Sequence, residues 1–352
     1  MSNRNNVIDC FRALAVIMVS FYHVYRHINP ELYFFGVNLY NPLLNGWMGV
    51  GIFFVVSGYC MGMATKKISK TIFSFRDYWD YFKKRLFRIS GPYYVSIAFW
   101  FVMINVFAIA VKPTETYDVL MHLFYTHNLD RDTMYSVSGV YWSLAVEMQF
   151  YVLLPLLIFI FPRSSSKFGL FLVLCGISTI IHFKYNETVI VSWSILAYLP
   201  VFVFGWLLYI NQRKLSIYLG NIYSCLIFFI ISFALVMIDS KLILGNILYE
   251  SISSLIFGLL MISIITSPFC GVFNASKTLG FISYIGRASF SIYLYNYIYL
   301  VFGFPNQETH GYLLVIAMVI FGIAMYNSIE KPYEYVRKNI LMKSNSTHVV
   351  KS

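Results

Sequence analysis

The chain has 352 residues, of which 59% are hydrophobic and only 12% are charged. A soluble domain carries about 25% charged residues, so this composition excludes an ordinary soluble protein and favours a membrane protein. The net charge of +11 could indicate a nucleic-acid-binding protein, but the basic residues cluster between apolar segments rather than on one polar face, which argues against such a partner.

A helix needs about 20 apolar residues to cross the hydrocarbon core of a membrane. By this rule the sequence predicts an all-α, polytopic integral membrane protein with about ten transmembrane helices. They lie at 7–26, 46–65, 91–111, 141–162, 168–183, 192–210, 217–238, 245–266, 279–301 and 311–329. No small-residue cleavage site follows the first run, so we expect it to be a retained helix rather than a signal peptide.

The 26 lysine and arginine residues predict the orientation of the chain. If the N-terminus is cytoplasmic, most of these side chains fall on cytoplasmic segments, as the positive-inside rule requires. An even number of helices then places both termini in the cytoplasm. We expect one transmembrane domain at 1–333, followed by a polar, frayed cytoplasmic tail at 334–352.

The first predicted helix carries two ionisable side chains in an apolar run, Arg12 and His23. Such groups are costly at membrane depth and usually have a partner or a function. A spacing of eleven residues brings both side chains to one helix face, about 16 Å apart along the axis. Asp9 precedes Arg12 by three residues, a spacing that allows an ion pair. A snorkelling arginine and a packed histidine are the purely structural interpretation.

The second predicted helix contains Gly58 and Gly62, at the spacing of small residues that lets two helices approach closely. Ser57 lies among apolar residues and needs a hydrogen-bond partner. The simplest partner is a backbone carbonyl one turn earlier in the same helix. These residues therefore predict close packing of the second helix.

The segment from Lys66 to Arg88 is strongly basic, and Arg85 and Arg88 in it are one helical turn apart. Such a cluster could bind anionic lipid head groups. It could equally bind the phosphates of a soluble cosubstrate, because the guanidinium fork matches phosphate oxygens. Gly91 and Pro92 follow and are typical of the first turn of a new helix.

The fourth predicted helix carries Glu147 and Gln149 among aromatic residues. A carboxyl group in a membrane is either neutral or paired. Arg12, His23 and Arg287 are the partners available within the predicted helices. We therefore expect Glu147 to have a functional or site-shaping role.

Several other classes of site are not favoured by the sequence. The five cysteines are scattered through apolar runs without a CxxC pair, which indicates neither a disulfide framework nor a zinc site, and no metal is expected. His127 and Asp132 match the His-x4-Asp spacing of glycerolipid acyltransferases, but they fall on an outward segment, away from cytosolic acyl-CoA. Motifs for nucleotide binding, zinc hydrolysis and serine hydrolysis do not occur.

Taken together, these residues resemble the membrane acyltransferase-3 family, the O-acyltransferases of bacterial surface polysaccharides. The resemblance covers nearly the whole chain and rests on five blocks in order: Arg12 and His23 (Arg-x10-His), Phe53–Tyr59 (FFxxSG), Arg85 and Arg88 (Arg-x-x-Arg), Trp142–Tyr151 (WSLxxExQFY), and Glu330 with Pro332 (E-x-P). Gly51 and Asn296 depart from the pattern, which often has an acidic residue and a histidine there. The hydrolase-like domain appended in some members is missing, so we expect the stand-alone type.

The resemblance implies transfer of an acyl group, usually acetyl, from cytoplasmic acyl-CoA to a sugar hydroxyl of a cell-surface polysaccharide such as O-antigen. The enzyme would lie in the bacterial inner membrane among lipids, with acetyl-CoA as donor and a lipid-linked or surface glycan as acceptor. His23 would activate the hydroxyl as a general base or accept the acyl group transiently, and the sequence leaves both routes open.

The resemblance also implies roles for the other site residues. Arg12 would stabilise developing negative charge or hold a cofactor phosphate, and Glu147 would orient or charge-stabilise the site. Arg85, Arg88 and Ser57 would bind the acyl-CoA.

The polarity and side of residues 112–139 make this segment the expected place for acceptor contacts. The competing class of function is a polytopic transporter of a polysaccharide precursor or small anion, because intramembrane ionisable groups also line substrate pathways. The internal repeats that are common in transporters are not apparent in this sequence.

Overall fold

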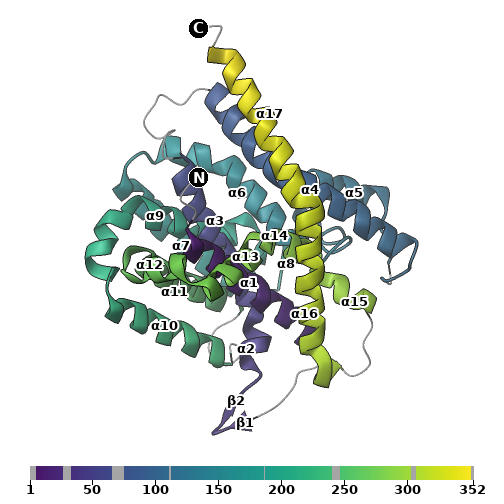
Figure 1. The fold of residues 1–352 in the computed structure, drawn as a ribbon, viewed down its shortest axis with the longest axis horizontal. Coiled ribbons are helices and arrows are strands. Elements are labelled where there is room, and N and C mark those ends of the chain that lie inside the picture. The colour runs from purple at the N-terminus through teal and green to yellow at the C-terminus, as the bar shows by residue number, and fades with distance from the viewer. Residues whose placement is uncertain are drawn as a thin grey trace.

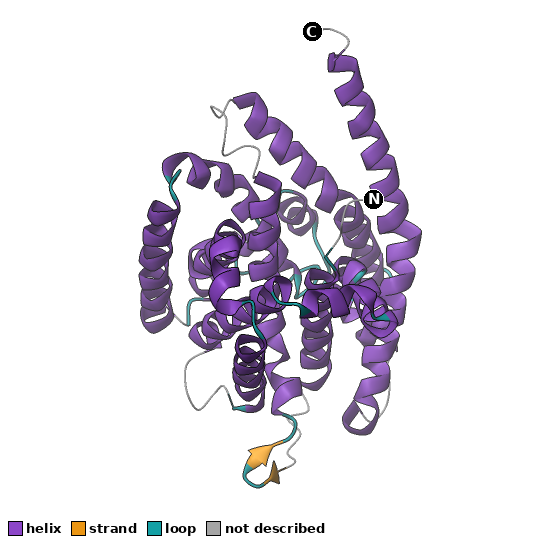
Figure 2. Cartoon of the chain, turned by 60° about the vertical axis from the view of Figure 1, so that its left-hand side comes forward, coloured by secondary structure: helices purple, strands orange, loops and turns teal. Residues whose placement is uncertain are grey.

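The computed structural model describes residues 5–26, 33–65, 75–110, 112–185, 187–239, 246–302 and 307–349. Helices make up almost all of this part of the chain, and a short hairpin of β1 (Tyr33–Phe34) and β2 (Val37–Asn38) projects at one end (Figures 1 and 2). Eight helical stretches of the described residues are long and apolar enough to cross a membrane. The predicted all-α, polytopic membrane fold is confirmed.

The longer helices are α1 (Asn6–Tyr25), α3 (Gly49–Thr65), α4 (Phe75–Asn105), α6 (Tyr141–Ile160), α7 (Ser164–Tyr185), α9 (Ile195–Leu219), α10 (Ile222–Met237), α11 (Asn246–Thr266), α16 (Gln307–Met325) and α17 (Lys331–Val349). The shorter ones are α2 (Asn41–Leu44), α5 (Thr116–Leu123), α8 (Val189–Ser192), α12 (Phe269–Ala275), α13 (Lys277–Arg287), α14 (Ser289–Leu294) and α15 (Tyr299–Phe302). Single turns connect some of them: the 3-10 turns η1 (Asn45–Met48), η3 (His127–Leu129) and η5 (Asn296–Ile298), and the π-turn η6 (Tyr326–Glu330).

Helix α1 is the centre of the packing, and it contacts α3, α13 and α16. Helix α3 packs against α9 through glycines on both sides. A side chain at Gly58 would overlap the backbone carbonyl of Phe202, and one at Gly205 would overlap that of Val55. The predicted close approach of the second helix is therefore confirmed, and it brings the FFxxSG block deep into the bundle.

One predicted transmembrane helix is wrong. The run at 279–301 is not continuous but is divided into α13, α14, η5 and α15. Gly286, near the end of α13, lies directly against the backbone carbonyl of Asp9 in α1. Irregular backbone at membrane depth is tolerated where it is buried in protein or lines a cavity, and this broken segment does both. The predicted run at 217–238 is also shortened, to the 16 residues of α10.

The basic segment is largely helical. Helix α4 begins at Phe75, so the prediction that Gly91 and Pro92 open a new helix is wrong, and residues 66–74 lie outside the described residues. A proline inside a helix loses one backbone hydrogen bond but is compatible with a kinked helix. Gly91 leaves room for the ring of Tyr333 in α17, whose hydroxyl donates to the Phe87 carbonyl at 2.6 Å. This contact joins α4 to α17.

The predicted fraying beyond Pro332 is also wrong. Helix α16 continues through the π-turn η6 into α17, which runs to Val349. Hydrogen bonds in a π-turn skip one more residue than in an α-helix. Pro332 consequently falls in the first turn of α17, where its missing N–H is tolerated.

Candidate functional site

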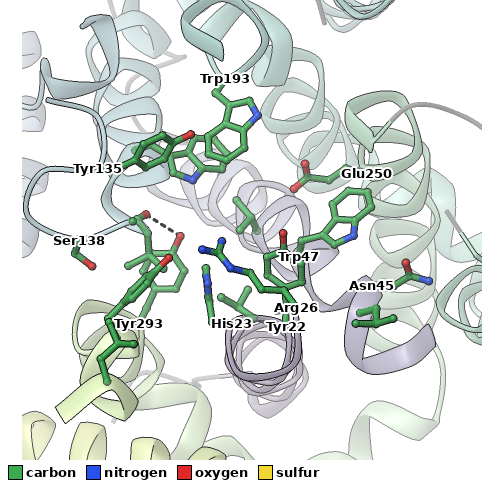
Figure 3. A pocket seen from close by; sticks show the side chains of 18 of the residues that line it. Tyr22, His23, Arg26, Asn45, Trp47, Tyr135, Ser138, Trp193, Glu250 and Tyr293 are labelled. Atoms are coloured by element: carbon green, nitrogen blue, oxygen red, sulfur yellow. Dashed lines mark hydrogen bonds between the residues drawn. The ribbon is translucent and has the colours of Figure 1, made fainter. Parts of the chain in front are cut away.

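Two adjoining cavities lie within the bundle. The basic cavity, of about 670 Å³, is bounded by parts of α1, α3, α4, α6, α14 and α17. The aromatic cavity, of about 930 Å³, lies nearer the β1–β2 hairpin and is shown in Figure 3. Val50 and Tyr293 line both cavities, so these two residues lie between the two spaces.

The basic cavity collects most of the predicted site residues. Its cationic side chains are Arg12, Arg85, Arg88, Arg287, Lys331 and Lys338, and its carboxyl groups are Glu147, Glu330 and Glu334. Ser57 lines it as well. Five of the six predicted site residues are therefore brought together from four helices, and the excess of cations suits an anionic ligand.

Arg12 is held by two contacts. Its Nη1 lies 3.4 Å from Oδ1 of the buried Asp9, which confirms the predicted ion pair. Its Nη2 donates to Sγ of Cys60 at 3.4 Å, a partner that spacing along one helix cannot reveal. The guanidinium is thus fixed between α1 and α3.

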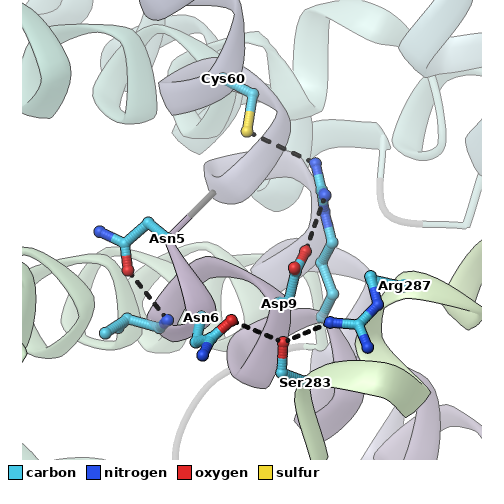
Figure 4. A network of polar contacts seen from close by, with 8 residues as sticks. Asn5, Asn6, Asp9, Cys60, Ser283 and Arg287 are labelled. Carbon is cyan, nitrogen blue, oxygen red and sulfur yellow. Dashed lines mark hydrogen bonds and ion pairs between the residues drawn. The ribbon is translucent and has the colours of Figure 1, made fainter. Parts of the chain in front are cut away.

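A second group of contacts continues from α1 to α13 (Figure 4). Arg287 Nη1 donates to the hydroxyl of Ser283 at 3.2 Å, and that hydroxyl donates to Oδ1 of Asn6 at 3.1 Å. This chain of contacts ties the last turn of α13 to the start of α1. Arg287 therefore lines the basic cavity in a supported position.

Glu147 lies at the centre of a compact hydrogen-bonded group. Its Oε1 accepts from the hydroxyl of Ser57 at 2.6 Å and from that of Tyr151 at 2.5 Å, and the two hydroxyls are 2.9 Å apart. The expectation that Ser57 bonds to a carbonyl of its own helix is wrong, because Glu147 offers a stronger acceptor across the helix interface. Arg12 shares the cavity with this carboxyl group, whereas His23 lies in the other cavity.

Glu330 is a residue of the basic cavity whose position the sequence does not predict. The π-turn η6 carries it, and its Oε2 accepts from the hydroxyl of Ser291 at 2.6 Å. The sequence signal is the E-x-P block, which is part of the family resemblance but to which we assigned no role in the site. π-Turns inside helices frequently mark functional sites, but a continuous apolar run such as 311–329 does not reveal one.

His23 lines the aromatic cavity and is 7% exposed. Its ring centroid lies 4.9 Å from that of Tyr297 and 5.2 Å from that of Tyr22. Four of the six tryptophans of the chain line this cavity, together with several tyrosines: Trp47, Trp100, Trp142, Trp193, Tyr22, Tyr33, Tyr135, Tyr198, Tyr293 and Tyr297. Figure 3 shows many of these rings around one open space with His23 at its edge.

Ionisable groups also face the aromatic cavity. Arg26, Asp239 and Glu250 line it, and Glu250 accepts from the hydroxyl of Tyr198 at 2.9 Å. A side chain at Gly51 would meet Ser254 and Glu250. The acidic group that the resemblance leads us to expect at position 51 therefore has no room there, and α11 brings the Glu250 carboxyl group to the same place.

Asn296 is the second departure from the family pattern. It is buried, and its Nδ2 donates to the hydroxyl of Ser20 at 3.0 Å. Ser20 lies almost one turn before His23 on α1. Asn296 therefore braces the helix that carries the histidine.

The expected acceptor segment, 112–139, reaches the aromatic cavity only through its last residues, Tyr135–Gly139. In the rest of this segment, the rings of His122 and His127 stack with their centroids 3.9 Å apart, and both side chains are buried. Burial lowers the pKa of His122 to about 4, and burial together with the neighbouring His122 lowers the pKa of His127 further. Asp132 is exposed, so the His-x4-Asp pattern forms no site.

All five cysteines are free, in agreement with the expectation that they form no disulfide framework. Among the residues that the structure describes, no group of three or more His, Cys, Asp or Glu side chains is placed to hold a metal ion.

Residues 5–327 match a family model described as an acyltransferase domain. Similar proteins include O-acetyltransferase OatA of Staphylococcus aureus (strain NCTC 8325 / PS 47), 28% identical over half of this chain and 29% of OatA. Putative peptidoglycan O-acetyltransferase YrhL of Bacillus subtilis (strain 168) is 26% identical over 92% of this chain and 54% of YrhL. Putative acetyltransferase ORF330 of Acidianus two-tailed virus is 23% identical over 94% of this chain and 90% of ORF330. The chain thus spans less than a third of OatA and about half of YrhL. No solved structure matches it.

Proposed function

This chain belongs to the acyltransferase-3 family, and on that basis we propose that it is a membrane O-acetyltransferase. It moves an acetyl group from acetyl-CoA to a sugar hydroxyl of a cell-surface polysaccharide. The observation that carries this proposal is the pair of adjoining cavities, one basic and one aromatic, with His23 in the second. An anionic donor and a sugar acceptor need different surfaces, and the two cavities offer them side by side.

The donor binds in the basic cavity. Arg85 and Arg88 project from one turn of α4 and hold the phosphates of CoA, because arginine forks match phosphate oxygens. Arg12 lies in the same cavity and not in that of His23, which supports a role in holding the donor. Ser57 and Glu147 shape the wall beside it. The thioester arm then extends along α1 towards His23.

The proposed orientation follows from the charge distribution. The N-terminus and α17 face the cytoplasm, in agreement with the positive-inside rule. The basic cavity then opens towards cytoplasmic acetyl-CoA, and the aromatic cavity opens towards the outer side, where the acceptor glycan is presented. The membrane is the inner membrane of a bacterial cell.

The acceptor binds in the aromatic cavity. A volume of about 930 Å³ lies within the usual range of about 300–1,000 Å³ for ligand pockets. Aromatic rings pack against the apolar faces of sugars, and Arg26 and Glu250 offer polar partners for hydroxyl groups. The similarity to YrhL, a putative peptidoglycan O-acetyltransferase, favours peptidoglycan as the acceptor, and O-antigen is the other candidate. Mass spectrometry of both glycans, with and without the chain, distinguishes them.

The chemistry is assigned to His23. As a general base it takes the proton of the sugar hydroxyl while the oxygen attacks the thioester carbonyl. The new C–O ester bond forms, the C–S bond breaks, and the proton passes from the imidazole to the departing CoA thiolate. A transient acyl-imidazole is the other route, and it would be trapped by rapid quenching and detected by its added acetyl mass.

The test compares two histidine variants. His23→Ala abolishes acetylation of the host glycan, whereas His182→Ala, at a buried histidine of α7 that lines neither cavity, retains it. Arg85→Ala/Arg88→Ala weakens CoA binding in detergent by tenfold or more, measured by calorimetry. Normal acetylation by a correctly inserted His23→Ala protein refutes the proposed mechanism. Solute flux through proteoliposomes without acyl-CoA turnover would instead indicate a transporter.

A further inference from the structure

Tyr293 occupies the junction of the two cavities. It lies on α14, inside the broken segment between α13 and α15. Among the described residues, only Tyr293 and Val50 line both cavities. Tyr293 is 6% exposed and Val50 is 8% exposed. A group that moves from one cavity to the other therefore passes these two side chains.

The ring of Tyr293 is fixed on several sides. Its hydroxyl donates to the Val140 carbonyl at 2.9 Å and lies 2.6 Å from the hydroxyl of Ser143. Phe53 meets the ring at 71°, with centroids 5.7 Å apart. Figure 3 shows the ring at the wall of the aromatic cavity, near His23. These contacts hold the aromatic ring at one position rather than leaving it to rotate freely.

We propose that Tyr293 determines which acyl group the protein transfers, by restricting the passage to short acyl chains such as acetyl. This inference rests on the proposed function, in which the thioester enters from the basic cavity and reacts beside His23. In this proposal the acyl chain lies between Tyr293 and Val50 when the thioester reacts, so each added methylene packs against the anchored ring or against Val50. Packed interiors do not accept extra methylenes without cost. One methylene in a confined pocket changes selectivity by roughly 10–200-fold.

The experiment measures release of the CoA thiol from acetyl-, propionyl- and butyryl-CoA, with isolated cell-wall glycan as the acceptor. Tyr293→Ala removes the ring, and we expect the ratio of kcat/KM for butyryl-CoA to that for acetyl-CoA to rise by about tenfold or more. Tyr293→Phe keeps the ring and keeps the wild-type preference for acetyl. Val50→Ala opens the same passage from the other side and raises the ratio with a smaller change in packing.

Tyr295→Ala is the matched control. Tyr295 is a buried neighbour whose ring packs against Phe99 and Phe321 and lines neither cavity, so its loss leaves the ratio unchanged. If the ratio of kcat/KM for butyryl-CoA to that for acetyl-CoA is unchanged in both Tyr293→Ala and Val50→Ala, the inference is overturned. It is also overturned if Tyr295→Ala raises this ratio as much as Tyr293→Ala does. Absence of turnover with every donor in the wild type would instead refute the proposed function. Turnover of all three donors at equal rates refutes only the inference about Tyr293.

Discussion

Replacing Ser57 by alanine tests the central hydrogen-bonded group of the basic cavity. Glu147 accepts hydrogen bonds from Ser57 and Tyr151 in a cavity that holds more cationic side chains than carboxyl groups, so we expect its carboxyl group to be charged. A hydrogen bond to a charged group contributes about 1.5–3 kcal/mol to stability, and a neutral one about 0.5–1.5 kcal/mol.

The expected cost of Ser57→Ala is therefore about 2 kcal/mol in the wild type. In a Glu147→Gln background the acceptor is a neutral amide oxygen, and the same substitution costs about 1 kcal/mol. The free energy of unfolding is measured in mixed detergent micelles by tryptophan fluorescence. Equal costs of Ser57→Ala in the two backgrounds contradict a charged acceptor at Glu147.

The control for this comparison is Ser253→Ala. Ser253 is buried, and its hydroxyl bonds to the Tyr249 carbonyl of its own helix at 2.7 Å. Its replacement removes a neutral hydrogen bond, so we expect a cost of about 1 kcal/mol that is the same in both backgrounds. A cost that changes with Glu147 would indicate a general effect on the bundle rather than a local one.

Three further outcomes are expected. Glu250→Gln keeps a hydrogen-bond acceptor for Tyr198 but removes the carboxyl group from the aromatic cavity, so the KM for the glycan rises while that for acetyl-CoA stays constant in steady-state assays. The pKa of His122 is lowered from 6.5 to about 4 in the folded protein. Below pH 6.5 the unfolded chain therefore binds more protons than the folded one, so the free energy of unfolding decreases by about 2 kcal/mol between pH 7 and pH 5. His122→Phe should flatten that dependence in thermal unfolding, and an unaltered slope would exclude His122 as its source. Gly58→Leu forces α3 away from α9 and should prevent accumulation of folded protein on size-exclusion chromatography, whereas a stable monodisperse variant contradicts the packing.

Local spacing in the sequence predicts part of the candidate site correctly. The three-residue separation of Asp9 and Arg12 predicts their ion pair, and the single helical turn between Arg85 and Arg88 places both on one wall. Contacts between distant segments are not predictable in this way. Ser57 finds its acceptor 90 residues further along the chain, and no periodicity within one helix carries that information.

The breaks in the helices are the other part of the fold that the sequence does not predict. Most residues of 279–301 are apolar, and a mostly apolar run has the same composition whether it is straight or interrupted. The interrupted segment contacts α1 at Gly286 and lines both cavities, and these are contacts with distant parts of the chain. The sequence does not predict the π-turn before Pro332 either, because the apolar run at 311–329 gives no sign of it. Both irregularities deliver side chains to the cavities.

The contact between Tyr333 and α4 has a consequence for the arrival of the donor. Arg85 and Arg88 lie on α4, while Lys331 and Lys338 lie on α17, so the spacing of these two helices sets the width of the basic cavity between these cations. The Tyr333 hydroxyl and the groove at Gly91 keep the helices together at this point. If the basic cavity binds the donor as proposed, the on-rate for this anionic cosubstrate depends on a tyrosine that is remote from any bond that is made or broken.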